Sequence, residues 1–226
     1  MLARMEGGEP VQYAVGECDF LDFTLKCDRR ALIPRPETEE WVAAALEELS
    51  AMGGAGRIAD VCTGSGCIAA AVARRFPAAR VVATDLSGEA LELARENFAR
   101  LGVAEHVETR QCDLLGGRAE DEGAFAAVLS NPPYIASAAC ETLEPVVRDF
   151  EPRLALDGGG DGLRVISRLA EEAGRVLQSG GRLWIEIGDE QGAAVEEILW
   201  KTNQFREIRV RCDFAGRARC AAAVRR

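Results

Sequence analysis

The sequence lacks the residues from which metal centres are usually built. His106 is the only histidine among 226 residues, and the eight cysteines are scattered without any Cys-x-x-Cys pair. A structural zinc site needs about four such ligands at close spacing. We therefore predict no metal site, and we expect the thiols to be free.

Long apolar runs, a signal-peptide pattern and clusters of basic residues are also missing. No apolar stretch approaches the roughly 18 residues of a membrane span, so we expect no membrane partner and a reducing compartment, either bacterial cytoplasm or an organelle matrix. Acidic residues outnumber basic ones by 37 to 27, which gives a formal charge of -10. Because this charge repels a nucleic-acid backbone, nucleic acid is not the expected primary partner.

What is present is typical of one folded domain with a short extension. Apolar residues make up 48% of the chain and charged residues 28%, which is ordinary for a globular protein. Residues 1–30 are mixed, with an alternating run at 20–26, and we predict an N-terminal linker and hairpin appendage there. Residues 31–226 are predicted to form the main domain, which we expect to be a monomer. It opens with a diproline elbow, residues 34–36, that leads into a helix ending near Met52.

From Arg57 onward, strand and helix patterns alternate. The predicted strands are residues 58–61, 80–84, 107–111, 126–130, 182–187, 205–213 and 220–224. The predicted helices are residues 68–76, 89–101, 163–177 and 191–202. Such alternation is that of βαβ units, with helices on both faces of a sheet. The two consecutive strands at the C-terminus imply an antiparallel hairpin on an otherwise parallel sheet, so the predicted fold class is α/β.

The first chemical signal is a glycine-rich loop, residues 60–66, between a predicted strand and a predicted helix. Gly64 and Gly66 permit the close approach of a ligand, and the helix start beyond them offers unpaired N–H groups. Tight turns of this kind also use glycine for purely structural reasons. The loop departs from the dinucleotide pattern Gly-x-Gly-x-x-Gly, and Asp60 makes it negative, which favours a cationic ligand such as S-adenosylmethionine.

Two further acids follow the next two predicted strands. Asp85 lies 19 residues after Gly66, where a carboxylate can accept both ribose hydroxyls of a nucleoside; alternatively, it caps the following helix. Asp113 can reach an adenine amino group, or it is a turn-forming aspartate. Together with Asp60, these acids predict an adenosine cradle at the ends of three strands.

The sharpest signal is Asn131-Pro132-Pro133-Tyr134, directly after the predicted strand 126–130. We call residues 131–134 the acceptor loop, because two prolines make it rigid and remove two N–H donors. The Asn131 side-chain carbonyl and the Pro132 backbone carbonyl can accept both hydrogens of an NH2 group, and Tyr134 can stack on its planar π system. An amide nitrogen is a weak nucleophile, and two such acceptors favour a pyramidal nitrogen and stabilise its developing charge. The loop therefore predicts a methyltransferase that acts on a planar NH2 group.

The chain resembles the glutamine-N5 methyltransferases of class I peptide chain release factors, a Rossmann-like class I methyltransferase family, over nearly its whole length. The landmarks of the resemblance are residues 8–13, Phe20, and residues 32–39, 60–66, 131–134, 150–152 and 159–163. The resemblance implies a seven-stranded, mostly parallel sheet, with residues 31–226 as the methyltransferase domain. It also implies S-adenosylmethionine as cofactor, S-adenosylhomocysteine as product, and the glutamine of a release factor Gly-Gly-Gln motif as substrate.

The resemblance also assigns roles to residues. The implied cofactor contacts, to which our reading adds Asp60 and Asp113, are Cys62, Thr63, Gly64, Ser65, Gly66, Asp85, Leu114 and Asn131. The implied substrate contacts are Asn131, Pro132, Pro133 and Tyr134, together with Phe20, Arg35 and Glu37 near the same mouth. Of these, Asn131, Pro132 and Tyr134 are the candidate catalytic residues.

Three departures from the family pattern affect these expectations. The family's helical N-terminal domain is expected to be essentially absent, which puts the affinity for a release factor in question. Cys62 stands at a position that is usually glycine, so its side chain must point away from the cofactor or crowd it. Leu114 stands where the family can place an aromatic residue near adenine, and we expect weaker cofactor binding.

Two other functions fit the same residues. One is methylation of another NH2 group, either a ribosomal-protein glutamine or N6 of adenine in nucleic acid. The net charge and the lack of a basic groove disfavour the nucleic-acid substrate. The other is a truncated regulatory module that binds the cofactor without turnover.

Overall fold

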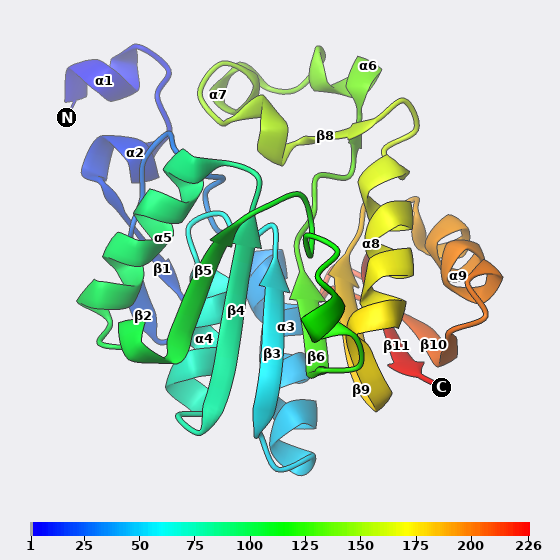
Figure 1. The fold of residues 1–226 in the computed structure, drawn as a ribbon. Helices are drawn as coiled ribbons and strands as arrows, with labels where there is room; N and C mark the ends of the chain where they lie inside the picture. The colour runs from blue at the N-terminus through cyan, green and yellow to red at the C-terminus, as the bar shows by residue number, and fades with distance from the viewer. Residues whose placement is uncertain (1) are drawn as a thin grey trace.

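A seven-stranded sheet forms the centre of the computed structural model, which describes residues 2–226 (Figure 1). Its inner strands are apolar runs: β6 (Phe125–Ser130) is buried at every position, and β3 (Gly56–Val61) is buried at its last four. Strands buried on both faces are typical of parallel sheets covered by helices. These two strands pair in parallel at the middle of the sheet.

The strand order is β10-β11-β9-β6-β3-β4-β5. The other strands are β4 (Ala79–Asp85), β5 (Val107–Gln111), β9 (Leu177–Glu186), β10 (Phe205–Cys212) and β11 (Ala218–Arg225). β11 runs antiparallel to both of its neighbours, and the remaining pairs are parallel. Because the chain builds the sheet outward in opposite directions from β3, the carboxyl ends of β3 and β6 border a crevice of the kind in which such sheets bind ligands.

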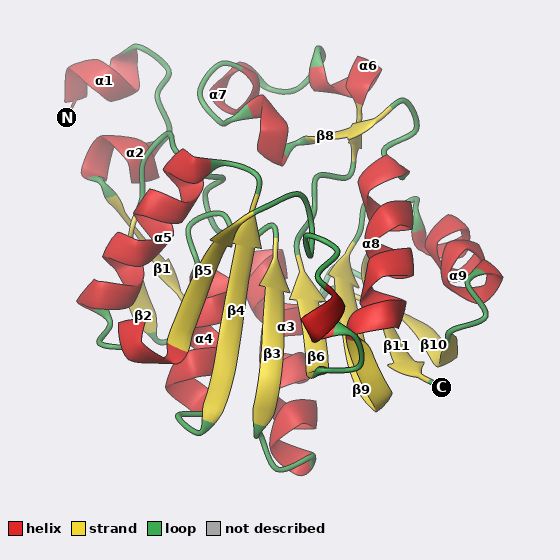
Figure 2. Ribbon diagram, in the orientation of Figure 1, coloured by secondary structure: helices red, strands yellow, loops and turns green. Residues whose placement is uncertain are grey.

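Helices cover both faces of the sheet (Figure 2). One face packs against α3 (Pro36–Ala51), α4 (Cys67–Arg75) and α5 (Gly88–Arg100), and the other against α8 (Arg164–Val176) and α9 (Gly192–Lys201). Alternate strand residues enter the two cores: Ile58 joins the first, and its neighbour Ala59 joins the second. None of the described helices combines the length and the apolar character needed to cross a bilayer.

The mixed seven-stranded sheet confirms the predicted fold class, and every strand and long helix predicted beyond Arg57 is present. The largest boundary error is at β9, which begins at Leu177, because the two glycines at 180–181 interrupt its apolar pattern. The sequence did not reveal α1 (Leu2–Glu6), α2 (Val11–Val15), β7 (Ile135–Ala136), α6 (Ser137–Cys140), α7 (Pro145–Arg148) and β8 (Asp157–Gly159). These elements have two to five residues, too few to display a periodic pattern.

The predicted N-terminal hairpin consists of β1 (Glu17–Phe20) and β2 (Phe23–Lys26). The structure contradicts the predicted substrate contact of Phe20, because its ring is 0% exposed and packs against Phe23 within the core that α3 and α4 share. An apolar ring in a half-exposed hairpin gains more from this burial than from facing solvent. The boundary at residue 30 stays a prediction.

Asn97 ties this hairpin to the rest of the molecule. The side chain is fully buried on α5, and its Oδ1 accepts from the Lys26 backbone N–H at 2.7 Å. Its Nδ2 donates to the Lys26 carbonyl at 3.1 Å and to the Ser65 carbonyl in the glycine-rich loop at 2.9 Å. One amide group therefore fixes the end of the hairpin against the loop that begins α4.

Replacing Asn97 by leucine should lower the free energy of unfolding by about 3 kcal/mol, because backbone groups that lose a buried partner cost roughly 1–3 kcal/mol each. Urea titration followed by circular dichroism measures the loss. The matched control is Gln178→Ala, which removes an exposed amide near the start of β9. It should change stability by less than about 0.5 kcal/mol. An equal loss in the two variants would contradict the anchoring role of Asn97.

Candidate active site

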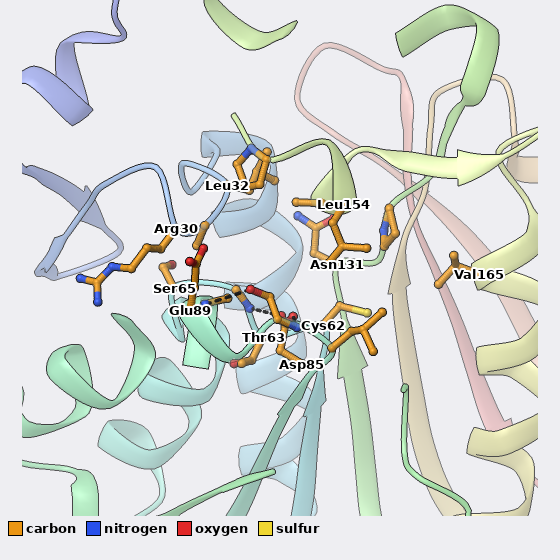
Figure 3. Close-up of a pocket in the computed structure, with 18 of the residues that line it drawn as sticks. Arg30, Leu32, Cys62, Thr63, Ser65, Asp85, Glu89, Asn131, Leu154 and Val165 are labelled. Carbon is orange, nitrogen blue, oxygen red and sulfur yellow. Dashed lines mark hydrogen bonds between the residues drawn. The ribbon is translucent and has the colours of Figure 1, made fainter. Parts of the chain in front are cut away.

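A cavity of about 560 Å³ lies at the carboxyl ends of the parallel strands. Figure 3 shows Cys62, Asp85 and Asn131 coming together there from the ends of β3, β4 and β6. The predicted residues that line the cavity are Cys62, Thr63, Gly64, Ser65, Asp85, Asp113, Leu114, Asn131 and Pro133. Asp60, Gly66, Pro132 and Tyr134 are outside this lining. The topology therefore gathers most of the predicted cofactor residues around one space.

The glycine-rich loop has its shape for two separate reasons. Gly64 and Gly66 both have positive φ angles, 55° and 84°, which side chains with a β-carbon disfavour. At Gly66 an added Cβ would also lie 2.6 Å from the Phe98 ring, so this glycine lets α5 pack onto the loop. The Gly64 N–H donates to Asp85 Oδ2 at 2.9 Å, which joins the ends of β3 and β4.

Asp60 supports the loop from behind the cavity. Its carboxylate is buried, and Oδ2 accepts from the Thr63 hydroxyl and from the Ala69 backbone N–H at 2.9 Å. Burial raises the pKa of Asp60 to about 7, against the opposing effect of these two donors. Within residues 2–226, no group donates to Asp60 Oδ1, so a buried acceptor remains available beside the loop.

Asp85 uses its carboxylate to order the backbone around the cavity. Besides Gly64, it accepts from the Ser87 N–H at 2.8 Å, and desolvation raises its pKa. The alternative in which Asp85 caps α5 is wrong, because Ser87 is the capping residue and accepts from the Ala90 N–H at 3.2 Å. The half-buried carboxylate also faces the cavity, which its predicted ribose contact requires.

Asp113 and Leu114 border the cavity beyond β5. The Asp113 carboxylate is exposed and pairs with Arg168 of α8 at 2.8 Å, while its backbone carbonyl accepts from the Gly116 N–H as in a tight turn. Leu114 is buried and has a φ of 51°, a left-handed conformation that is rare for a bulky residue. Cys62 shares this feature with a φ of 59°. Two strained residues thus line one cavity, as often occurs at functional sites.

The acceptor loop leaves two carbonyl groups free. Asn131 Nδ2 donates to Thr38 Oγ1 at 3.3 Å, whereas no donor in the described part of the chain reaches Asn131 Oδ1 or the Pro132 carbonyl. The Tyr134 hydroxyl donates to Glu186 Oε1 at 3.2 Å, and Gln191 Nε2 donates to the Tyr134 carbonyl at 2.9 Å. The loop is therefore anchored by its nitrogen, hydroxyl and last carbonyl, and the predicted acceptors are unengaged.

Two glycines let the turn at 158–162 pack directly against the backbone of the acceptor loop. An added Cβ at Gly162 would lie 2.2 Å from the Tyr134 carbonyl oxygen, and one at Gly158 would lie 2.7 Å from that of Pro133. Any side chain at either position would displace the loop backbone. The sequence marked this turn only as a family landmark, and its contact with the loop appears only in the fold.

The remaining predicted substrate residues lie outside the cavity lining. Arg35 forms an ion pair with Glu151, whose side chain is 2% exposed, and the same carboxylate accepts from the Ile33 N–H. This pairing fixes the diproline elbow. Glu37 is half-buried in the first turn of α3, where an acid is favoured near the positive helix end. Direct substrate contacts of Arg35 and Glu37 stay predictions.

Two residues beside the acceptor loop, Thr38 and Glu186, were not predicted from the sequence. Thr38 lies in the first turn of α3, just after the elbow, and Glu186 ends β9. An acid that closes an apolar strand is the signal that pointed to Asp85, and the same reasoning applied to residues 183–187 finds Glu186. Thr38 carries no comparable signal. Across residues 2–226, no group of three or more histidine, cysteine or acidic side chains is arranged to hold a metal ion.

Comparison with known proteins places the chain in a family. The model of the methyltransferase small domain matches residues 42–160. A methyltransferase from Pyrococcus furiosus superimposes with a TM-score of 0.64 at 19% identity, over 99% of this chain and 96% of that one, which shows a shared fold.

Relatives with much higher identity cover nearly the whole chain. The release factor glutamine methyltransferase of Moorella thermoacetica is 43% identical over 99% of this chain and 77% of its own length. The protein of the same name from Gloeobacter violaceus is 42% identical over 94% and 73%. The chain therefore belongs to the family of release factor glutamine methyltransferases.

Proposed function

We propose that the protein transfers a methyl group from S-adenosylmethionine to the side-chain amide nitrogen, N5, of the Gly-Gly-Gln glutamine in a class I peptide chain release factor. The observation that supports this most directly is the pair of unengaged acceptors, Asn131 Oδ1 and the Pro132 carbonyl, on a loop fixed beside a cavity. The names of the relatives support the choice of substrate.

The cavity suits the proposed cofactor in size and in chemistry. Its volume of about 560 Å³ falls within the roughly 300–1,000 Å³ of ordinary ligand sites. Asp85 offers a carboxylate to ribose hydroxyls, and the buried, partnerless Asp60 Oδ1 adds a hydrogen-bond acceptor behind the loop. When bound, S-adenosylmethionine supplies an electrophilic methyl group on a positively charged sulfur.

The residues of the acceptor loop would then bind and orient the amide. Asn131 Oδ1 and the Pro132 carbonyl accept the two N–H bonds, which turns the nitrogen lone pair toward the methyl group. The same acceptors stabilise the positive charge that develops on nitrogen during transfer. Tyr134 restricts the amide plane by contact with its ring. The methylated amide then releases one N–H proton to water, and no side chain is assigned as a general base.

Charge favours a protein substrate over a nucleic acid. The formal charge of -10 repels phosphates, and most arginines at the cavity are neutralised by acids, as in the pairs Arg30–Glu96 and Arg168–Asp113. All eight cysteines are free, which fits the reducing compartment that we infer, a bacterial cytoplasm or an organelle matrix.

The Asn131→Ala variant should reduce kcat about 100- to 1000-fold, because removing one preorganised hydrogen-bond partner of the transition state has this effect. The assay follows transfer of a labelled methyl group to a release factor and locates it by mass spectrometry. The matched control Gln178→Ala removes an exposed amide far from the cavity and should retain full activity.

Two substrate controls accompany this assay. A release factor with glutamate in place of the Gly-Gly-Gln glutamine should remain unlabelled, and so should double-stranded DNA. Labelling of DNA with an unlabelled release factor would refute the proposed function. Unchanged turnover in Asn131→Ala would refute only the role of that residue.

The Asp85→Ala variant should weaken S-adenosylmethionine binding at least about 10-fold, because hydrogen bonds to a charged group contribute roughly 1.5–3 kcal/mol. Isothermal titration calorimetry measures the Kd. Asp22→Ala, which removes an exposed carboxylate on the hairpin turn, is the control and should bind normally. Normal affinity combined with lost activity in Asp85→Ala would rule out the ribose contact.

The Cys62→Gly variant should stabilise the protein by up to about 1 kcal/mol, because a left-handed residue with a Cβ is strained by roughly 1–2 kcal/mol and glycine's extra entropy offsets part of the gain. Thermal unfolding checks the direction. The same substitution at Cys112, whose φ is not positive, should instead destabilise. If both variants lose stability equally, the φ of Cys62 carries no strain.

A further inference from the structure

Glu186 is a buried carboxylate that the acceptor-loop chemistry has not used. Its side chain is 1% exposed at the end of β9, and desolvation raises its pKa while three donors and the charge of Arg219 oppose the shift. Oε2 accepts from the Thr38 hydroxyl at 2.6 Å and from Trp41 Nε1 at 2.8 Å, and Oε1 accepts from the Tyr134 hydroxyl at 3.2 Å. Both oxygens therefore face α3 and the acceptor loop.

The direction of each hydrogen bond follows from chemistry. Trp41 can only donate, so Glu186 Oε2 is an acceptor. Three donors and the charge of Arg219 favour an ionised Glu186, and towards an ionised carboxylate the Thr38 hydroxyl is the donor in the 2.6 Å contact with Oε2. A hydroxyl has one hydrogen, and with that hydrogen directed at Glu186 the Thr38 oxygen can only accept.

This polarity decides which end of the Asn131 amide faces the cavity. Only a donor can approach Thr38 Oγ1, so Asn131 must present its NH2 group there, at 3.3 Å. The amide carbon is planar, and its carbonyl oxygen then points away from Thr38. Both residues line the cavity, so the reversed amide would place a donor where an acceptor is needed.

We propose that Thr38, held by Glu186, is the positioning residue that orients the Asn131 amide so that its carbonyl oxygen meets the substrate NH2 group. This inference rests on the proposed function. The same carboxylate holds the Tyr134 hydroxyl, so both ends of the acceptor loop share one anchor. Thr38 thereby sets the specificity for an NH2 donor through its hydrogen bond to Asn131.

A double-mutant cycle tests whether Thr38 acts through Asn131. Thr38→Val keeps the shape of the side chain and removes the hydroxyl, and it should lower kcat at least about 10-fold, since misplacing a reacting group by about 1 Å can cost about 100-fold. In an Asn131→Ala background the same change should cost less than about 2-fold, because nothing remains to orient. An equal loss in both backgrounds would overturn the proposal.

Conservative variants separate positioning from support of the fold. Thr38→Ser keeps the hydroxyl and should retain kcat within about 3-fold, whereas a loss as large as that of Thr38→Val would overturn the proposal. The Kd for S-adenosylmethionine and the Tm should be nearly the same in the two variants. If Thr38→Val does not fold, Thr38→Ala replaces it in the cycle.

A spectroscopic measurement tests the geometry without any substrate. The side-chain NH2 signals of Asn131 are identified by their loss in Asn131→Ala. Slow hydrogen exchange of these signals is expected in the wild type and in Thr38→Ser, and fast exchange in Thr38→Val. Equal exchange in all three would overturn the positioning role. An inactive wild type with this exchange pattern would refute the proposed function alone.

Discussion

The buried carboxylate of Glu186 joins three segments that are distant in the sequence: the start of α3, the end of β9 and the acceptor loop. An ionised carboxylate is costly to bury unless donors surround it. Thr38, Trp41 and Tyr134 therefore have to occupy fixed places for the fold to hold this charge. The geometry of the acceptor loop depends on that requirement, because its two polar side chains are the ones that the network fixes.

Around this network, the cavity takes its shape from the backbone. Gly158 and Gly162 allow one turn to press on the acceptor loop, and Gly66 allows α5 to press on the glycine-rich loop. Close contact between backbones leaves little room for either loop to shift. The strained conformations of Cys62 and Leu114 are kept by the same surroundings.

The N-terminal segment supports the site and also borders it, because Arg29, Arg30, Leu32 and Pro34 line the cavity. Asn97 fixes the hairpin to the glycine-rich loop, and Arg35 with Glu151 fixes the elbow before α3. Because Thr38 follows that elbow by two residues, the position of its hydroxyl depends on this ion pair. The landmark residues 32–39 therefore both border the cavity and place the start of α3.

Local pattern was sufficient to predict the α/β class, the strands and long helices, and the acids and glycines at the strand ends, because periodicity and turn chemistry are properties of neighbouring residues. It also predicted Asn131 and Pro132 as acceptors, since two prolines leave a loop few donors. The burial of Phe20, the capping of α5 by Ser87 and the pairing of Arg35 with Glu151 were decided by packing between distant segments. The orientation of the Asn131 amide belongs to this second group. It follows from a hydrogen-bond chain through Thr38 to Glu186, which lies 148 positions further along the sequence, and only the fold brings these groups within bonding distance.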